Sequence, residues 1–589
     1  MKKIENILLL LFALLSVVAC NKLDIPPMNI IQDKDVFAKE SGITAYMASL
    51  YNDLPIEDFN FTRNGFRQLD SYPGLYTVTG EALLCPSNLS SSSPEGGWWQ
   101  HWGYGTIRDV NYFLSNFPAY AHIFPTERAN IWLGEAHFIR AYNYFAMVKR
   151  YGGVPIIIKV QNYPEQSIEQ LSVPRDSEKA VYEFIGQELD SAIALLPVAS
   201  PELGRVNKYV AYALKSRAML YAGSIAQYGR IQLDGLLGIP ASDAQKFYQA
   251  SYDASVELAG HYSLYRKYND KYENYWNLFL DDDSPENIFC EYYKYPEKTH
   301  SLDAQDIPHQ MMGPDGYSSF VNPTLEFVEM FDDVNGNSGV LKVDDANGNP
   351  LRFNNTMDLF NNVEPRLRGT VILPGDGFKG ESIEVYKGTY TTYPSGELFT
   401  ATDANVLYQG KSVIGKSGMG NNEMTGTGFF NRKYQNPYMV GTVALWRSAQ
   451  KYIDIRYGEI LLNRAEAAFQ LSKIDDALLA INDIRDRAGA KLLTQGQLTA
   501  KSIQKERRME LSFENQTYWD LRRWRIADTE MNNAQYRALC PYYVFDEGKF
   551  IFKKEPYGKK YTFDVKVNYV QIPTDQIFTN NKLIQNPGY

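Results

Sequence analysis

Residues 455–489, IRYGEILLNRAEAAFQLSKIDDALLAINDIRDRAG, predict two helices that pack against each other. Apolar residues of the first segment recur at helical spacing, at Leu461, Ala465, Ala468 and Phe469. Those of the second segment do the same, at Ala477, Ile481 and Ile484. Ser472-Lys473 supplies a short turn between them, and Gly489 is a typical residue at the end of a helix. The stretch therefore predicts a helix hairpin.

Small residues in this hairpin indicate close packing, and in this respect it resembles a tetratricopeptide repeat. They lie where the two helices must approach each other, at Ala465, Ala468, Ala477 and Ala480. Other segments with helical patterns are Asp35–Leu54, Ala129–Arg150, Ser177–Leu196, Lys208–Gly223 and Phe247–Gly260. We therefore predict an all-α fold, a scaffold of tetratricopeptide-type helix hairpins with long irregular loops and minor β-structure. The periodicity leaves open an unrelated all-α assembly.

Charged residues of the C-terminal helices recur at spacings that allow ion pairs on a helix. They include Arg456, Glu459, Arg464, Glu466, Glu506 and Glu510. Paired charges can fix helices where they cross, so we interpret these residues as part of the scaffold and not as a catalytic or ligand-binding set.

Two stretches of the sequence lack helical periodicity. Residues 58–105 include the Ser-rich segment LSSSSPEGG and then WWQHWGYG, and residues 281–441 are rich in Gly, Asn, Asp, Pro and Tyr, with short β-like runs such as Ile383–Tyr393. Long irregular regions inside a large protein are usually functional. The sequence divides into a signal peptide (1–19), a tether (20–34), an N-terminal helical region (35–280), a loop-rich region (281–441) and a C-terminal helical region (442–589).

The N-terminus carries an export signal. In MKKIENILLLLFALLSVVAC, two lysines precede an apolar run that is too short to span a bilayer comfortably. Cys20 follows small residues at the expected cleavage position, which predicts a lipoprotein whose mature N-terminus is the lipidated Cys20. An ordinary secreted protein is the alternative. The Pro-Pro pair at 26–27 is typical of an extended tether.

Composition excludes several functional classes. The net charge of −10 provides no basic field for nucleic acid or for an anionic membrane surface. The four cysteines (Cys20, Cys85, Cys290, Cys540) form neither a disulfide framework nor a C-x-x-C metal motif. No second long apolar segment follows the signal.

The motifs of common enzymes are missing from the sequence. There is no Walker loop, no G-x-S-x-G elbow and no H-E-x-x-H, and the six histidines are scattered. Asp333-x-Asn335-x-Asn337 and Asp345-x-Asn347-x-Asn349 are similar to calcium loops but lack the sixth-position glycine and the final glutamate. We therefore predict no enzyme activity, no cofactor and no metal site. A glycosidase needs only two carboxylates at a suitable separation, and the sequence does not indicate which acidic residues would form such a pair.

The motifs together resemble the SusD/RagB family of outer-membrane lipoproteins of the Bacteroidetes, almost from end to end. The matching stretches are Cys20 to Pro27 with Leu50-Tyr51, Phe138 to Phe145 with Tyr151 to Pro155, Lys208 to Tyr221, Ile455 to Glu466, Ile481 to Gly489, Glu506 to Leu511, Asp520 to Trp524 and Gln585 to Tyr589. The resemblance implies four tetratricopeptide-like helix pairs and a non-catalytic lid over a SusC-like TonB-dependent transporter at the cell surface. It also implies that loops on this scaffold capture oligosaccharides for import.

Aromatic residues of the irregular segments are the candidate sugar contacts, because sugars stack their C–H faces on exposed rings. The foremost candidates are Trp98, Trp99 and Trp102, followed by Tyr295 and Tyr317. Arg67, Asp70, Tyr72 and Tyr76 are candidate hydrogen-bonding partners, and Trp276 is expected in the core. Three alternatives to glycan capture stay open: capture of peptides, a secreted glycoside hydrolase, and a purely structural scaffold.

Overall fold

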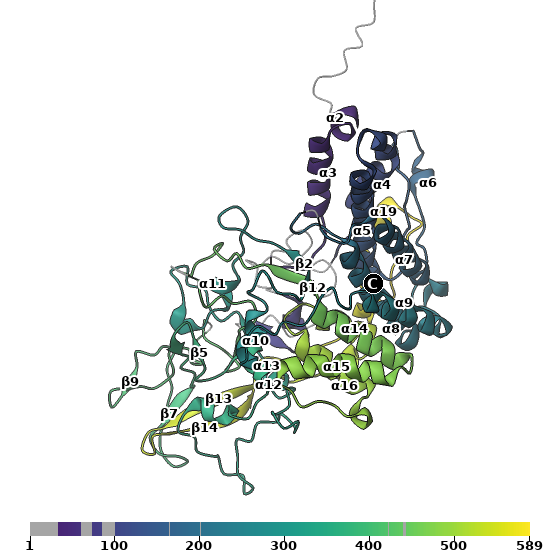
Figure 1. Ribbon diagram of the computed structural model, residues 1–589. Helices are drawn as coiled ribbons and strands as arrows, with labels where there is room; N and C mark the ends of the chain where they lie inside the picture. Colours follow the sequence, from purple (N-terminus) through teal and green to yellow (C-terminus); the bar gives the residue numbers. More distant parts are fainter. Residues whose placement is uncertain are drawn as a thin grey trace, which may run out of the picture.

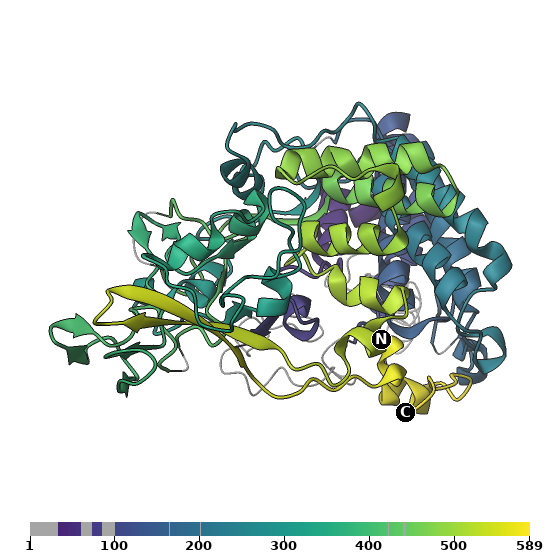
Figure 2. The same ribbon diagram turned by 90° about the horizontal axis from the view of Figure 1, so that it is seen from below.

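The computed structural model describes residues 33–59, 74–84, 100–163, 165–200, 202–421, 423–439 and 443–589. Long helices fill one half of the molecule, and loops with short strands fill the other (Figure 1). Figure 2 shows the same division from below, with the long hairpin β13–β14 running along the loop-rich half. The expected fold class, helix hairpins with irregular loops and minor β-structure, is confirmed.

The helices fall into a long set and a short set. The long ones are α3 (Glu40–Asn52), α4 (Tyr104–Asn116), α5 (Thr126–Tyr151), α7 (Glu178–Leu195), α8 (Lys208–Tyr228), α9 (Ala244–Val256), α14 (Tyr457–Gln470), α15 (Ile474–Ala488) and α16 (Ala500–Glu510). The short ones are α2 (Asp33–Phe37), α6 (Ile168–Leu171), α10 (Lys271–Asn277), α11 (Leu302–Asp306), α12 (Leu325–Val328), α13 (Pro365–Thr370), α17 (Thr517–Arg523), α18 (Ala527–Met531) and α19 (Thr574–Thr579). Successive long helices pack as neighbours, α5 on α7, α7 on α8, α8 on α9 and α14 on α15, and α14 joins the two series by packing on α9.

The strands are short and form small sheets. They are β1 (Ala82–Leu84), β2 (Asn287–Glu291), β3 (Val321–Pro323), β4 (Val371–Ile372), β5 (Gly377–Phe378), β6 (Glu381–Ser382), β7 (Gly388–Tyr390), β8 (Leu398–Phe399), β9 (Leu407–Tyr408), β10 (Lys411–Ser412), β11 (Phe430–Asn431), β12 (Tyr452–Arg456), β13 (Arg537–Val544) and β14 (Lys549–Pro556). One sheet has four strands in the order β14-β13-β7-β8, and β2 pairs antiparallel with β12. The pair β2–β12 connects the loop-rich half to α14, which follows β12 directly.

Local chemistry sets several helix ends. Ser177 caps α7 by accepting a hydrogen bond from the Ala180 backbone, and Asn207 caps α8 in the same way for Tyr209 and Val210. Gly489 ends α15 with φ of +74°, a left-handed conformation that favours glycine. The ends of α7, α14 and α15 lie within a few residues of the boundaries that the sequence predicts.

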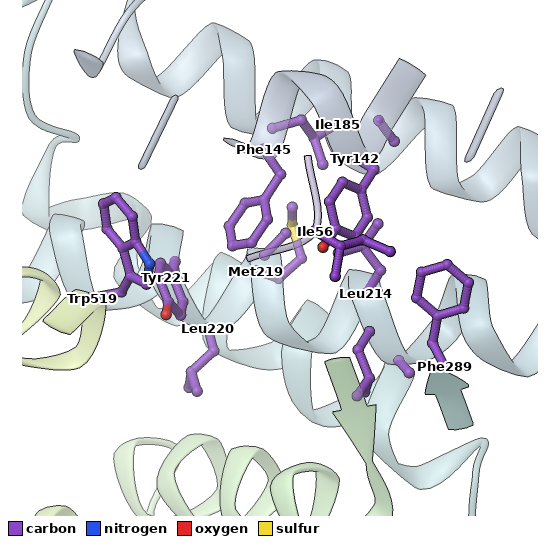
Figure 3. Close-up of a cluster of buried hydrophobic side chains, with 14 of the residues drawn as sticks. Ile56, Tyr142, Phe145, Ile185, Leu214, Met219, Leu220, Tyr221, Phe289 and Trp519 are labelled. Carbon is purple, nitrogen blue, oxygen red and sulfur yellow. The ribbon is translucent and has the colours of Figure 1, made fainter. Parts of the chain in front are cut away.

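The main apolar core lies between the long helices. Figure 3 shows Tyr142 and Phe145 of α5 facing Leu214, Met219 and Tyr221 of α8. Phe289 of β2 and Trp519 of α17 close the two ends of this cluster. Segments separated by hundreds of residues therefore share one core, and its burial is the main favourable contribution to folding.

Two elements differ from the sequence prediction. The predicted helix Asp35–Leu54 is broken after Phe37, whose ring turns into an aromatic cluster with Tyr46 and Phe113. The second difference is the hairpin β13–β14, which lies inside the predicted C-terminal helical region and pairs with β7. The strand β7 itself falls within the predicted β-like run. The proposed division of the chain at residues 280 and 441 stays a prediction.

A buried network of charges lies where the two halves meet. We define the central ion network as Glu286, Glu364, Arg366, Lys433, Arg456, Arg485, Arg487, Glu506, Glu510 and Glu514. Arg456 is 1% exposed and donates to Glu286 (3.0 Å), Glu510 (2.8 Å) and Glu514 (2.7 Å). Arg487 bonds to Glu286 and Glu510 as well.

The network links elements from both halves. Arg366 of α13 donates to Glu506 (2.7 Å) and Glu510 (2.8 Å) of α16, and Lys433 after β11 pairs with Glu514 (2.9 Å). Burial opposes the charge on Glu510, yet Arg487 and Arg456 hold the pKa of Glu510 well below its usual range. Because an unpaired buried charge is costly, each of these elements must keep its position for the others to be satisfied.

The other charges singled out from the sequence also pair across elements. Glu459 binds Arg217 of α8 (2.6 Å), Glu466 binds Arg523 of α17, and Arg464 binds Asp476 of α15. The interpretation as scaffold is thus confirmed for these side chains. The pairs connect different helices and are not i, i+4 pairs within one helix; Glu459 and Glu466 face the core, whereas Arg464 and Asp476 are half-buried.

A buried histidine fixes the loops of the loop-rich half to the core. The His300 ring lies 4.4 Å from the Phe59 ring and 4.7 Å from the Tyr293 ring, centroid to centroid. Nδ1 accepts a hydrogen bond from the Leu302 backbone (3.3 Å), and Nε2 bonds to the Gln450 carbonyl (3.0 Å). This arrangement needs the neutral ring, and burial lowers the pKa of His300 to about 3.

We predict that Arg456→Met lowers the free energy of unfolding by about 3–5 kcal/mol, since it leaves buried carboxylates without a partner. Urea unfolding of the purified protein measures this change. The matched control is Arg266→Met, because Arg266 is 40% exposed and pairs with exposed Asp483 and Asp486. Its cost should stay below about 1 kcal/mol. Equal unfolding midpoints for the two variants would contradict a central role for the network.

We also predict a pH signature for His300. The unfolded chain protonates histidine near pH 6.5, whereas the folded ring stays neutral to about pH 3, so the stability contributed by neutral His300 is lost as pH falls from about 6.5 toward 3. His300→Gln removes this proton uptake, so its destabilisation relative to the parent should shrink between pH 7.5 and pH 4.5 in urea titrations. Exposed His122 supplies the control His122→Gln. A pH-independent difference for His300→Gln would contradict the assignment.

Candidate functional site

Four exposed aromatic side chains lie on two adjoining loops of the loop-rich half. They are Tyr295 (53% exposed), Tyr317 (37%), Tyr438 (63%) and Trp446 (44%), which together we call the aromatic surface. Large aromatic rings are usually buried at least in part, so a group of exposed rings on adjoining loops indicates a contact surface.

Hydrogen bonds hold the described parts of two loops, 292–320 and 436–448 (without 440–442), side by side. His300 and Ser448 exchange two backbone hydrogen bonds of 3.0 Å each. The Trp446 N–H donates to Ser301 Oγ (3.0 Å), and the Leu445 N–H donates to Asp315 Oδ2 (2.8 Å). Trp446 is therefore tied at one side to the segment that carries Tyr295 and at the other to the segment that carries Tyr317.

A buried carboxylate strengthens this junction. Asp303 of α11 accepts hydrogen bonds from the Asn436 N–H (2.7 Å) and from Gln450 Nε2 (3.0 Å). Its own N–H donates to Ser448 Oγ (3.1 Å). Asn436, at the start of the second loop, and Ser448, at its end, are therefore both held against α11 before any ligand arrives.

Tyr438 rests on a buried tryptophan. Its ring stacks on Trp276 with the centroids 6.0 Å apart and the planes at 23°. Trp276 is 8% exposed, as the sequence predicts, and the Arg432 guanidinium lies 5.2 Å from its ring. One face of Tyr438 is thus supported while most of the side chain stays in solvent.

Trp446 has an unusual backbone. Its φ of +58° is in the left-handed region, which costs a non-glycine residue about 1–3 kcal/mol. The hydrogen bonds from the backbone N–H groups of Trp446 and Leu445 offset this cost, and the Trp446 side chain is 44% exposed. Arg447 is the next residue, and its guanidinium lies 5.9 Å from the Tyr295 ring. It adds a hydrogen-bond donor beside this ring.

The surface combines flat apolar faces with hydrogen-bonding groups at their edges. Such a set can bind polyhydroxylated ligands by stacking and hydrogen bonding. In the part of the chain that the structure describes, no three His, Cys, Asp or Glu side chains are grouped so that they could hold a metal ion. Asp333 and Asp345 instead accept hydrogen bonds from their own loops, as in Asx turns, with the Asn335 and Asn347 N–H groups at 2.8 Å.

All predicted site residues except Tyr76 fall into three groups. Tyr295 and Tyr317 lie on the aromatic surface. Trp102 is half-buried against Tyr104 (5.1 Å) and Tyr151 (5.3 Å), at the start of α4. The remaining predicted contacts, Arg67, Asp70, Tyr72, Trp98 and Trp99, lie outside the described residues, as does the lipidation site Cys20.

Tyr76 corrects one expectation. It is 4% exposed, and its ring packs edge-on against Phe513 at 5.2 Å in a buried cluster. A tyrosine in this position supports the fold, because its ring faces the protein and not the solvent.

Sequence reasoning missed Tyr438 and Trp446. Both occur in the irregular stretch around the proposed boundary at 441, in Asn436-Pro437-Tyr438 and Leu445-Trp446-Arg447. Aromatic residues next to turn-forming residues and outside any helical period were the available signal.

Comparisons with known proteins identify the family. The model of the SusD family matches residues 285–589. A second model, described as starch-binding associating with outer membrane, matches residues 78–220. None of the curated proteins compared with this chain matches it.

Solved structures share the fold. A SusD-like protein from Bacteroides fragilis NCTC 9343 is 23% identical with a TM-score of 0.66, over 95% of this chain and 99% of that chain. A SusD-like carbohydrate binding protein from the same organism is 20% identical with a TM-score of 0.66, over 93% and 100%. Surface glycan-binding protein A from Bacteroides fluxus is 17% identical with a TM-score of 0.57, over 94% and 100%. The helices and loops of this chain match these structures over almost its whole length. Because the SusD family model covers more than half of the chain, the protein belongs to the SusD family.

Proposed function

We propose that this protein is a non-catalytic glycan-binding lipoprotein of the outer membrane. It captures oligosaccharides or polysaccharides at the cell surface and delivers them to a SusC-like TonB-dependent transporter. Membership of the SusD family supports this proposal, as do the carbohydrate-binding and glycan-binding proteins that share its fold.

The observation that carries the proposal is the aromatic surface. Its rings are exposed, supported from below and fixed by hydrogen bonds to α11, so little conformational entropy is lost when a ligand binds. Sugar rings present apolar C–H faces that stack on such side chains. A neutral glycan also needs no charged field, in agreement with a chain of net charge −10.

Anchoring follows from the N-terminus. Lipidation of Cys20 and the Pro-Pro tether after it would hold the protein at the membrane while the body moves as a lid over the transporter. Among the residues described by the structure, no helix is both long and apolar enough to cross a bilayer.

We predict that Tyr295→Ala, Tyr438→Ala and Trp446→Ala each weaken glycan binding by about 1–2 kcal/mol, or about five- to thirtyfold. Affinity electrophoresis against a panel of polysaccharides identifies the ligand, and calorimetry then measures each variant. Phe578→Ala is the matched control, because Phe578 is 84% exposed but lies on α19 of the helical half.

The same experiment separates the alternatives. Unchanged affinity in all three variants would contradict the aromatic surface as the site. Release of products from any glycan by the purified protein would contradict the non-catalytic proposal, and retention of peptides in place of glycans would indicate peptide capture. The double change Trp98→Ala with Trp99→Ala tests the foremost sequence-based candidates and should abolish binding if they contact the ligand.

A second prediction concerns the anchor. Cys20→Ala should release soluble protein that still binds glycan, because it removes the lipid without touching the fold. Cell fractionation followed by affinity electrophoresis measures both properties. Cys290→Ser, a change at a buried free thiol, should leave the protein in the membrane fraction. Membrane retention of Cys20→Ala would contradict lipid anchoring.

A further inference from the structure

A second carboxylate of α11 is buried beside the loops of the aromatic surface. Asp306 has no exposed surface, and its Oδ2 accepts a hydrogen bond from Asn431 Nδ2 (3.1 Å). Gln435 Nε2 donates to the Asp306 carbonyl oxygen (3.0 Å). The next residue, Asn436, begins the second loop and bonds to Asp303. One turn of α11 therefore holds the segment from Asn431 to Asn436, and we call these five residues the α11 junction.

The charge that an ionised Asp306 would carry has no counterion in the junction. Among the described residues no cation lies within ion-pair distance of its carboxyl group. The two cations of the neighbouring segment are paired elsewhere, Arg432 with Asp376 (2.8 Å) and Lys433 with Glu514 (2.9 Å). A carboxylate that is buried without a cation is unfavourable in its charged form.

The junction also has too few hydrogen-bond donors for an ionised Asp306. Asp306 Oδ1 and Gln435 Oε1 are both buried, and neither has a hydrogen-bond partner among the described residues. A charged carboxylate and an amide oxygen can only accept hydrogen bonds, so ionisation leaves both oxygens unsatisfied. Protonation gives the carboxyl group an O–H donor and removes its charge. The arrangement therefore favours the neutral form of Asp306.

The titratable groups around the junction agree with this assignment. Burial raises the pKa of Asp306 to about 7, the Asn431 amide opposes this shift, and the charge of Asp303 adds to it. Tyr76 is close to Asp306, and burial followed by the charge of Asp306 keeps the pKa of Tyr76 far above the neutral range. Glu81, just before β1, is a second buried carboxyl group whose pKa burial raises to about 7.

We propose that Asp306 is a proton-dependent positioning residue, whose neutral carboxyl group keeps the segment 431–436 on α11 and whose ionisation near neutral pH loosens this segment. The segment leads into the loop that carries Tyr438 and Trp446, so the aromatic surface is ordered best in mildly acidic solution. The junction does not depend on what the protein binds, whereas its effect on ligand capture rests on the proposed function.

The size of the effect follows from proton linkage. When the segment opens, Asp306 contacts water and titrates near pH 3.9, whereas in the closed segment it titrates near pH 7. The closed state therefore binds more protons between these two values, and its advantage over the open state is lost as pH rises from about 4 toward 7. From pH 6 to pH 8 the open population should increase about tenfold.

Hydrogen–deuterium exchange of the full chain without added glycan measures this opening. Protection factors, which are corrected for the intrinsic effect of pH on exchange, should fall about tenfold in residues 431–439 between pH 6 and pH 8 and stay constant in α8. In Asp306→Asn the amide supplies a donor at every pH, so the protection should not depend on pH. Asp403→Asn, at an exposed carboxylate, should retain the pH dependence of the parent.

A second variant keeps the test valid if Asp306→Asn does not fold. Asn431→Ala removes the amide that favours the charged carboxyl group, so the loss of protection should move to higher pH. Equal protection of the parent at pH 6 and pH 8 would overturn the proposal. So would an undiminished pH dependence in Asp306→Asn, which would assign the effect to another group such as Glu81. A failure to bind glycan, by contrast, would contradict only the proposed function, because this measurement uses no ligand.

Discussion

The pairing of Arg456 with Glu286, Glu510 and Glu514 is the constraint on which the rest of the structure depends. Charges buried this deeply must be satisfied together, so the strand, helices and loops that supply them cannot shift independently. The two loops of the aromatic surface start from this network. Loop 292–320 follows Glu286 through β2, and loop 436–448 lies between Lys433 and Arg456. Because β2 pairs with β12, the same ladder brings both loops to one side of the molecule. The scaffold therefore positions the described parts of the two loops of the aromatic surface through electrostatics as much as through apolar packing.

Much of the helical half could be predicted from the sequence, because its signals are local. Ser177 and Asn207 cap helices, Gly489 ends one, and apolar residues recur at the helical period. The hairpin β13–β14 could not be recognised in this way. Ala538, Cys540 and Tyr542 face one apolar cluster while Leu539 faces another, so both faces of the strand are buried and no alternation of polar and apolar residues marks it. After the break, the Phe37 ring contacts Tyr46 nearby and Phe113 far along the chain, and no local pattern records the second contact.

The aromatic surface could be predicted in kind, but only some of its residues could be named from the sequence. Aromatic residues in irregular segments were the available signal, and Tyr295 and Tyr317 are exposed. Their contact with a ligand stays a prediction. Tyr76 belongs to a similar segment but packs against Phe513, which is distant in sequence, so its burial is a tertiary property. Trp446 is exposed because Ser301 and Asp315 hold its backbone and that of Leu445 in place. Exposure of an aromatic side chain is decided by such long-range contacts, and composition alone cannot distinguish a supporting ring from a binding one.

Hydrogen–deuterium exchange of the full chain, with and without the polysaccharide it retains, tests the central claim most directly. If the aromatic surface captures the glycan, added protection should concentrate in residues 292–320 and 436–448, while the long helices α5, α7 and α8 exchange as before. The account would be contradicted if bound glycan protected the helical scaffold and left both loops unchanged.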